Sequence, residues 1–143
     1  MSASDYALLD EKTLDPRPNY WAALLWHRLM GRVVLDPGRQ SVDDLYVYAH
    51  CQANHSGGVT VLAINAGDNA RELNTSMNGE RYTLSSTQLD GVAMQLNGKT
   101  LTAASDGSVP QISGVPIRAG GVSLSPASIT FLAFPGAANA ACR

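Results

Sequence analysis

The hydrophobic pattern of this chain changes its period once, near residue 31. Residues 6–9 form a short apolar run typical of a buried strand, and a loop with prolines at 16 and 18 follows. Apolar side chains then recur at helical spacing on two faces: Trp21, Leu24, Leu25, Trp26, Leu29 and Met30. Asn19 suits the N-cap of this helix and Gly31 its C-terminal end, so the pattern predicts a strand, a loop and a helix over 19–30.

After residue 31 the period becomes two, which is typical of β-strands. Strands are expected over 45–51, 59–65, 71–74, 81–85 and 128–134. The Asn97-Gly98 pair favours a type I′ turn and predicts a hairpin over 94–101, whereas 103–121 is rich in Gly, Ser and Pro and has little periodicity. The expected fold is mainly β: an antiparallel β-sandwich of about eight strands, preceded by one strand-loop-α-helix unit.

Composition excludes several functional classes. The chain has 143 residues, a net charge of −2 and only 15% charged residues, so no basic surface for nucleic acid is expected. No apolar run approaches the roughly 18–20 residues that a membrane span needs. The N-terminal Met-Ser-Ala-Ser-Asp lacks the basic and apolar regions of a signal peptide, so a secreted protein would need an N-terminus elsewhere.

Two cysteines, Cys51 and Cys142, leave two interpretations open. In a reducing compartment they are unpaired thiols, one in a strand and one near the C-terminus. As a disulfide they would close a loop of about 90 residues, worth about 4–5 kcal/mol in the chain-entropy model. Their spacing does not decide between these states.

The order of these segments resembles the C-terminal third of heparanase and related β-glucuronidases, glycoside hydrolase family 79. The resemblance begins with 6–31, including its Asp15-Pro-x-Pro-Asn-Tyr-Trp block, and continues through Leu45-Tyr-Val-Tyr-Ala-His-Cys51 and 58–65. It extends through 95–101 to the closing segment 131–142, and so covers almost the whole chain.

The resemblance implies a division of the chain into two units. In that family a (β/α)₈ barrel carries catalysis and a β-sandwich packs against its side, partly with strand material from the N-terminal region. Residues 1–31 would then be the last βα unit of the barrel, and 32–143 the C-terminal β-sandwich domain. The resemblance also implies a Cys51–Cys142 disulfide and hence a place outside the cytoplasm. Tyr6, at the end of the last barrel strand, would contact the carboxylate of a uronic acid.

The catalytic residues of the family have no counterpart in this sequence. Its enzymes hydrolyse glycosidic bonds with retention, using two glutamates roughly 5–5.5 Å apart that lie on earlier barrel strands. The glutamates here are Glu11, Glu72 and Glu80, and none matches a catalytic position. Asp10 and Glu11 are adjacent but would point to opposite sides of an extended segment, so they are interpreted as loop residues or partners of Lys12 and Arg17. The chain is expected to be inactive alone, without catalytic residues, metal or organic cofactor.

Other candidate residues have simpler structural interpretations. A metal site at His50, Cys51 and His55 is disfavoured because strand neighbours face opposite ways. Trp21 and Trp26 could stack on sugars, but on an amphipathic helix they are interpreted as core residues. Exposed tyrosines are better candidates for weak glycan contacts: Tyr46, Tyr48 and Tyr82. Asn54-His-Ser56 and Asn74-Thr-Ser76 fit the N-glycosylation pattern, which matters only in a eukaryotic secretory protein.

Two hypotheses about function follow. The first is a non-catalytic β-sandwich region that supports the barrel of a heparanase-like hydrolase, in the same or a companion chain, acting on β-glucuronides or uronic-acid polysaccharides. The second is a free-standing module that binds a glycan or a protein and buries both tryptophans without a barrel. In either case the apolar helix or an open sheet edge could drive self-association.

Overall fold

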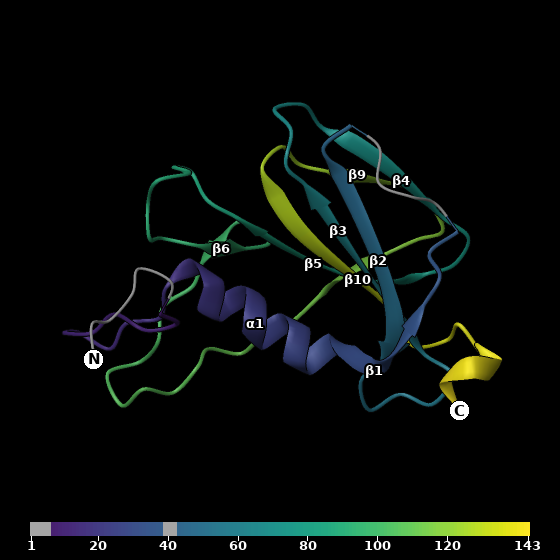
Figure 1. The fold of residues 1–143 in the computed structure, drawn as a ribbon, viewed down its shortest axis with the longest axis horizontal. Coiled ribbons are helices and arrows are strands. Elements are labelled where there is room, and N and C mark those ends of the chain that lie inside the picture. The colour runs from purple at the N-terminus through teal and green to yellow at the C-terminus, as the bar shows by residue number, and fades with distance from the viewer. Residues whose placement is uncertain (1–6, 39–42) are drawn as a thin grey trace.

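The computed structural model describes residues 7–38 and 43–143 (Figure 1). The elements in chain order are α1 (Pro18–Leu29), β1 (Met30–Leu35), β2 (Leu45–Gln52), β3 (Val59–Asn65), β4 (Arg71–Thr75), β5 (Gly79–Ser85), β6 (Gln95–Leu96), β7 (Lys99–Thr100), β8 (Val115–Ile117), β9 (Gly120–Leu124), β10 (Ser128–Phe134) and a short 3₁₀ helix, Ala140–Cys142. The expected helix is present, as are the strands expected after residue 31.

Every strand pairing is antiparallel. One sheet of eight strands has the order β1-β2-β3-β10-β5-β6-β7, with β8 added on β5, and a second sheet contains β4 and β9. Asn97 and Gly98 both have positive φ, as a type I′ turn between β6 and β7 requires. The predicted antiparallel, mainly β fold is therefore confirmed, with ten strands in residues 7–38 and 43–143 instead of about eight.

The large sheet is covered on both faces, so the molecule has three layers. On one face α1 packs over a core of Trp21, Leu25, Leu29, Met30, Leu62, Tyr82, Leu84, Leu96, Phe131 and Ala133. On the other face β4 and β9 close a smaller core of Ala63, Val122, Leu124, Leu132 and Phe134. β3 and β10 contribute to both cores, which explains why their sequences are apolar nearly throughout.

Helix α1 begins one residue earlier than predicted. Its N-cap is Arg17 and Pro18 occupies the first turn, so the prediction of Asn19 as N-cap was wrong. Proline has no N–H to leave unpaired and its φ already suits a helix, which makes the first helical position favourable for it.

The C-terminal end of α1 also differs from the prediction. The helix ends at Leu29, and Met30 is already extended and starts β1, so Gly31 does not terminate the helix. The Leu29 carbonyl accepts hydrogen bonds from the Ala53 N–H (3.0 Å) and the Thr60 hydroxyl (2.9 Å). Because tertiary partners satisfy this carbonyl, a glycine cap is not needed.

The described part of the predicted first strand is not buried. Leu8 is 48% exposed and Leu9 38% exposed, and Leu9 makes only an isolated bridge with Pro16. Within the described chain no neighbouring strand pairs with these residues, so the predicted buried strand does not form there, and its burial in a barrel stays a prediction.

A Cys51–Cys142 disulfide joins β2 to the C-terminal 3₁₀ helix, with the two Cα atoms 5.2 Å apart. The N–H of Gly57 also donates to the Cys142 carbonyl, and the N–H of Asn139 donates to the Gly57 carbonyl. The implied disulfide is present in the structure, and it fixes the C-terminal segment against the turn between β2 and β3.

Candidate functional site

The loop that precedes α1 is organised around the carboxylate of Asp10. Its Oδ1 accepts hydrogen bonds from the N–H groups of Lys12 (2.9 Å) and Thr13 (3.1 Å), and its Oδ2 lies 3.3 Å from Nη2 of Arg17. The two backbone N–H groups, helped by Arg17, lower the pKa of Asp10 to about 2. The interpretation of Asp10 as a loop residue paired with a nearby cation is confirmed.

Beneath this loop lies a cavity of about 500 Å³, here called the loop hollow. It is lined by Asp10, Thr13, Asp15, Pro16, Arg17, Pro18, Asn19 and Val92. Most of these side chains are polar, and they include two carboxyl groups and one guanidinium group. The sequence marked the loop by its prolines but did not indicate a cavity, since Val92 comes from a distant turn.

Tyr6 lies outside the described residues, so its predicted contact with a uronic acid carboxylate stays a prediction. Glu11, the neighbour of Asp10, is exposed in the loop. Glu72 is exposed on β4 in the small sheet, and Glu80 lies on β5 in the large sheet. The structure therefore places the three glutamates on separate elements.

Tyr82 is buried rather than exposed, which corrects the sequence-based prediction. Its hydroxyl donates a 2.6 Å hydrogen bond to Oε2 of Glu80, and its ring lies so close to Gly114 that a Cβ there would come within 2.7 Å of it. Burial, and then the adjacent Glu80, raise the pKa of Tyr82 to about 12. Tyr82 is thus a packing residue and not a surface contact for glycans.

The two tryptophans of α1 differ sharply in exposure. Trp21 is 2% exposed, as predicted for a core residue, whereas Trp26 is 42% exposed within this chain, and its predicted burial at a seam with a barrel stays a prediction. The Trp26 ring packs edge-on against His50 at a centroid distance of 5.1 Å, and Nδ1 of His50 lies 2.7 Å from the Gly31 carbonyl oxygen. The helical period alone could not predict which of the two tryptophans is buried, because α1 is apolar on both faces.

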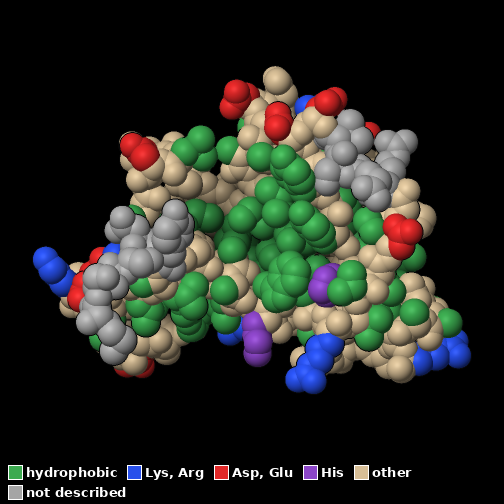
Figure 2. Space-filling view, viewed as in Figure 1, with side chains coloured by type: hydrophobic (Ala, Val, Ile, Leu, Met, Phe, Trp, Pro, Cys, Tyr) green, Lys and Arg blue, Asp and Glu red, His purple; other side chains and the backbone are tan. Residues whose placement is uncertain are grey.

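Tyr46 and Tyr48 extend the exposed apolar surface beside Trp26. Tyr48 pairs directly with Leu62 and Tyr46 with Ile64, so both tyrosines share the sheet face that α1 covers. Figure 2 shows this side of the molecule, with hydrophobic side chains gathered at its centre and most charged side chains near its margin. We call Trp26, Tyr46 and Tyr48 the aromatic face.

His50, Cys51 and His55 do not form a metal-binding set. The Cys51 sulfur is bonded to Cys142, and Nδ1 of His50 faces the Gly31 carbonyl. Within 7–38 and 43–143, no group of three or more His, Cys, Asp or Glu residues is placed to hold a metal ion. The possible glycosylation residues Asn54 and Asn74 are both exposed, the first in a turn and the second on β4.

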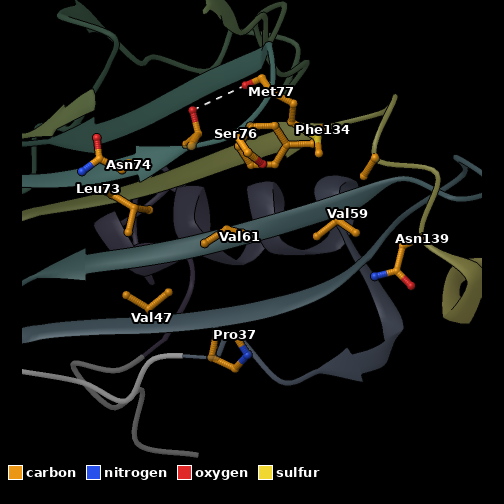
Figure 3. Close-up of a pocket in the computed structure, with 12 residues that line it drawn as sticks. Pro37, Val47, Val59, Val61, Leu73, Asn74, Ser76, Met77, Phe134 and Asn139 are labelled. Atoms are coloured by element: carbon orange, nitrogen blue, oxygen red, sulfur yellow. Dashed lines mark hydrogen bonds between the residues drawn. The ribbon is translucent and has the colours of Figure 1, made fainter. Parts of the chain in front are cut away.

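A second cavity, of about 360 Å³, opens between the small sheet and the large one and is here called the sandwich groove (Figure 3). Val47 of β2, Val59 and Val61 of β3 and Phe134 of β10 line it from the large sheet. Leu73 of β4 lines it from the small sheet. The groove runs beside the edge of β4 that does not pair with β9. Sequence periodicity gave no signal for it, since its walls come from different parts of the chain.

Taken together, these features define a class: a mainly β domain of antiparallel sheets with one attached helix, an exposed aromatic face and an apolar groove. No helix among the described residues has the length and apolar character needed to cross a membrane.

Comparison with known proteins shows which proteins this chain is similar to. The chain is 32% identical over 146 residues to baicalin-beta-D-glucuronidase of Scutellaria baicalensis, an alignment covering 95% of the chain and 27% of that protein. It is 28% identical over 156 residues to heparanase of Bos taurus, with 98% and 28% covered. It is also 29% identical over 163 residues to inactive heparanase-2 of Mus musculus, with 96% and 28% covered. The predicted relationship to heparanase and the β-glucuronidases, glycoside hydrolase family 79, is confirmed over nearly the whole chain.

The alignments leave most of each relative uncovered, because the chain spans somewhat more than a quarter of the length of these proteins. No family model matches the chain. The similarity therefore indicates the family of the sequence. The activity of those longer proteins is attributed to this chain only as a proposal.

Proposed function

We propose that this chain is the non-catalytic C-terminal β-sandwich region of a heparanase-like retaining glycoside hydrolase, acting on β-glucuronides or uronic-acid polysaccharides. Its role is to support the catalytic (β/α)₈ barrel, which lies in the same chain or in a companion chain. Residues 1–31 form the last βα unit of that barrel, and 32–143 form the sandwich domain. The region is extracytoplasmic, which the Cys51–Cys142 disulfide supports.

The observation that carries this proposal is the exposed aromatic face. Trp26, Tyr46 and Tyr48 form an apolar surface beside α1, and α1 has no charged side chain from Pro18 to Trp26. A helix exposed to water on one side normally carries charged residues there, so an uncharged exposed side indicates a further packing partner. A barrel that packs on α1 opposite the sheet would cover this surface.

Tyr6 is the residue through which the region takes part in substrate binding. It would stand at the C-terminal end of the last barrel strand, where the active sites of such barrels are built. A phenol hydroxyl there donates a hydrogen bond to the uronic acid carboxylate. The catalytic glutamates are supplied by the earlier barrel strands, and no metal or organic cofactor takes part.

The edge of β4 that does not pair with β9 is a site for a further strand. A strand from another part of the larger protein would pair with this edge and cover the apolar lining of the sandwich groove. If this strand is absent, the unpaired edge and the aromatic face are the two surfaces through which the chain would associate with itself. Lysine or proline, which blunt exposed edges, do not occur in β4.

A free-standing glycan- or protein-binding module is the alternative. The packing of α1 on the sheet favours it, because the helix buries Trp21 within this chain and without a barrel. The exposure of Trp26 opposes it, since a self-contained module was expected to bury both tryptophans. The two proposals thus differ in whether the aromatic face has a partner.

The mass of the native protein from its source, measured intact with and without a reductant, tests the proposal. A mass several times the 15.1 kDa of this chain is expected, together with β-glucuronidase activity of that larger protein. A native mass equal to this chain, in a monomer whose tryptophan fluorescence is fully protected from quenchers, would overturn the proposal in favour of the module. The small mass change on reduction reports the disulfide in the same experiment.

A further inference from the structure

A cavity of about 670 Å³ lies at the C-terminal end of α1 and is here called the basic hollow. Its lining comes from α1, β1, β2 and the turn after β2: Trp26, His27, Met30, Gly31, Arg32, His50, Ala53 and Asn54. The twelve residues of α1 span about 18 Å, so the basic hollow is well separated from the loop that precedes this helix.

The charge of the basic hollow differs from that of the chain as a whole. Its lining contains the guanidinium of Arg32 and the imidazoles of His27 and His50, and no Asp or Glu is among these described lining residues. The chain has a net charge of −2, so basic side chains do not gather here because of composition. An anionic group in the hollow would meet no like charge from its walls.

Two of these basic side chains have nitrogens available to a ligand. The guanidinium of Arg32 is exposed and has no ion-pair partner among residues 7–38 and 43–143. Nδ1 of His50 lies 2.7 Å from the Gly31 carbonyl oxygen, and because a carbonyl only accepts, Nδ1 must carry the hydrogen. Nε2 of His50 is then the nitrogen left for a ligand. The side-chain amide of Asn54, which is exposed, adds a further donor.

The end of a helix normally repels anions, because its last carbonyl groups carry partial negative charge. Here those carbonyls are occupied. The Leu29 carbonyl accepts hydrogen bonds from the Ala53 N–H and the Thr60 hydroxyl, and the Gly31 carbonyl accepts from His50. The groups that would oppose an anion are therefore bonded within the fold.

Trp26 gives the basic hollow an apolar wall. Its ring is 42% exposed and packs edge-on against His50, which fixes its position. An exposed indole beside cationic side chains suits a ligand that has both C–H groups and a negative charge, as an acidic sugar does. A barrel on α1 would stand at this wall, whereas Arg32, His50 and Asn54 belong to the sandwich side of the hollow.

We propose that the basic hollow is an accessory binding site for the carboxylate of a uronic acid unit in a polysaccharide, with Arg32 as its principal ligand and Trp26 as the surface for the sugar ring. Arg32 pairs with a carboxylate through a planar guanidinium that can donate two parallel hydrogen bonds. The site lies at the opposite end of α1 from the strand-to-helix loop, so it holds the polymer away from the position of bond cleavage. The choice of a uronic acid rests on the proposed function.

Isothermal titration calorimetry of the disulfide-bonded 143-residue chain tests the site. The probe is an unsulfated oligosaccharide of alternating glucuronate and N-acetylhexosamine, compared with the same oligosaccharide after its carboxylates have been reduced to hydroxymethyl groups. Reduction of the carboxylates, or Arg32→Gln, is expected to raise Kd about tenfold, as loss of a charge-assisted hydrogen bond predicts. In an NMR titration the indole N–H of Trp26 should shift, and that of the buried Trp21 should stay in place.

Arg28→Gln is the matched control, because Arg28 is an exposed basic residue in the last turn of α1 that does not line the hollow. Loss of affinity in Arg32→Gln alone, with an unchanged melting temperature, would support the site. Absence of binding, equal binding of the carboxyl-reduced oligosaccharide, or equal losses in both arginine variants would overturn it. Binding by the chain is measured without catalysis, so a larger native protein that cleaves no β-glucuronide would refute the proposed function and leave this result separate.

Discussion

The two faces of the eight-stranded sheet are covered by elements of very different kind. On one face α1 places large side chains, among them Trp21 and Leu25, over the centre of the sheet. On the other, the two short strands β4 and β9 do the same with Val122 and Leu124. Each cover is narrower than the sheet, so each leaves an apolar margin: the aromatic face beside α1, and the sandwich groove beside β4.

On both faces of the sheet, apolar side chains are buried at the centre and exposed toward β2. The central strands β3 and β10 are buried on both sides, whereas β2 is covered incompletely on both. We interpret the two margins as the places where the rest of a larger protein packs.

The largest effect is expected from Trp21→Ala in the helix-covered core. Removing this side chain, which is 2% exposed, leaves a cavity and is expected to lower the free energy of unfolding by about 3–5 kcal/mol. Chemical denaturation of the 143-residue chain, followed by circular dichroism, measures the change. Trp26→Ala is the control and is expected to cost about 1 kcal/mol or less, because Trp26 is 42% exposed. Equal losses in both variants would contradict the difference between the covered centre and the open margin.

The next largest loss of stability is expected from removing the disulfide between β2 and the C-terminal 3₁₀ helix. Cys51→Ser combined with Cys142→Ser opens a link between residues 91 positions apart, and is expected to destabilise the fold by about 2–5 kcal/mol. Thermal unfolding of this variant, compared with the disulfide-bonded unsubstituted chain, measures the loss. Hydrogen exchange should show faster exchange at Gly57 and Asn139, whose N–H groups hold the C-terminal segment. Unchanged exchange at these two positions would mean that the segment stays docked without the disulfide.

A smaller effect is expected at Tyr82, inside the helix-covered core. Its pKa is raised from about 10 to about 12 in the folded state, so between these pH values the folded protein binds more protons than the unfolded chain. Stability should therefore fall as the pH rises from 10 towards 12. Tyr82→Phe removes this dependence, together with the hydrogen bond to Glu80. Unfolding measured at several alkaline pH values in both proteins would reveal the difference, and parallel curves would refute it.

The smallest effect is expected from Asp10, in the loop before α1. Its pKa is lowered to about 2 in the folded state, so its contribution to stability is present above the unfolded pKa near 4. That contribution is lost as the pH falls through 2. Asp10→Asn should lose some stability at neutral pH and show a flatter acid limb, whereas Glu11→Gln should keep the acid limb unchanged. Thermal shifts between pH 2 and pH 5 measure both variants.

Much of the fold could be predicted from local sequence patterns. The apolar runs 59–65 and 128–134 match β3 and β10 in their bounds, and Asn97-Gly98 forms the expected turn. These features depend on residues adjacent in the chain, which is why a local pattern contains them. Strand β8 within 103–121 and strand β9, which begins at residue 120, were missed, since each is short and pairs with a strand far away in sequence.

The candidate site was less accessible to prediction. The sequence identified the loop after residue 9 and the pairing of Asp10 with a nearby cation, but the loop hollow also needs Val92 from a distant turn. The burial of Tyr82 was also not predicted, because it depends on packing against Gly114, a residue 32 positions later. Neither contact leaves a periodic signal.

The sequence by itself determined the elements, the hairpin turn and the family of this protein, because hydrophobic period, turn residues and motif order are properties of neighbouring residues. Tertiary structure decided where α1 ends, since the carbonyl of Leu29 is satisfied by Ala53 and Thr60 rather than by a cap. It also decided that Trp21 is buried and Trp26 exposed. The physical reason is that burial depends on how wide the covering layer is, and that width is set only when distant segments come together.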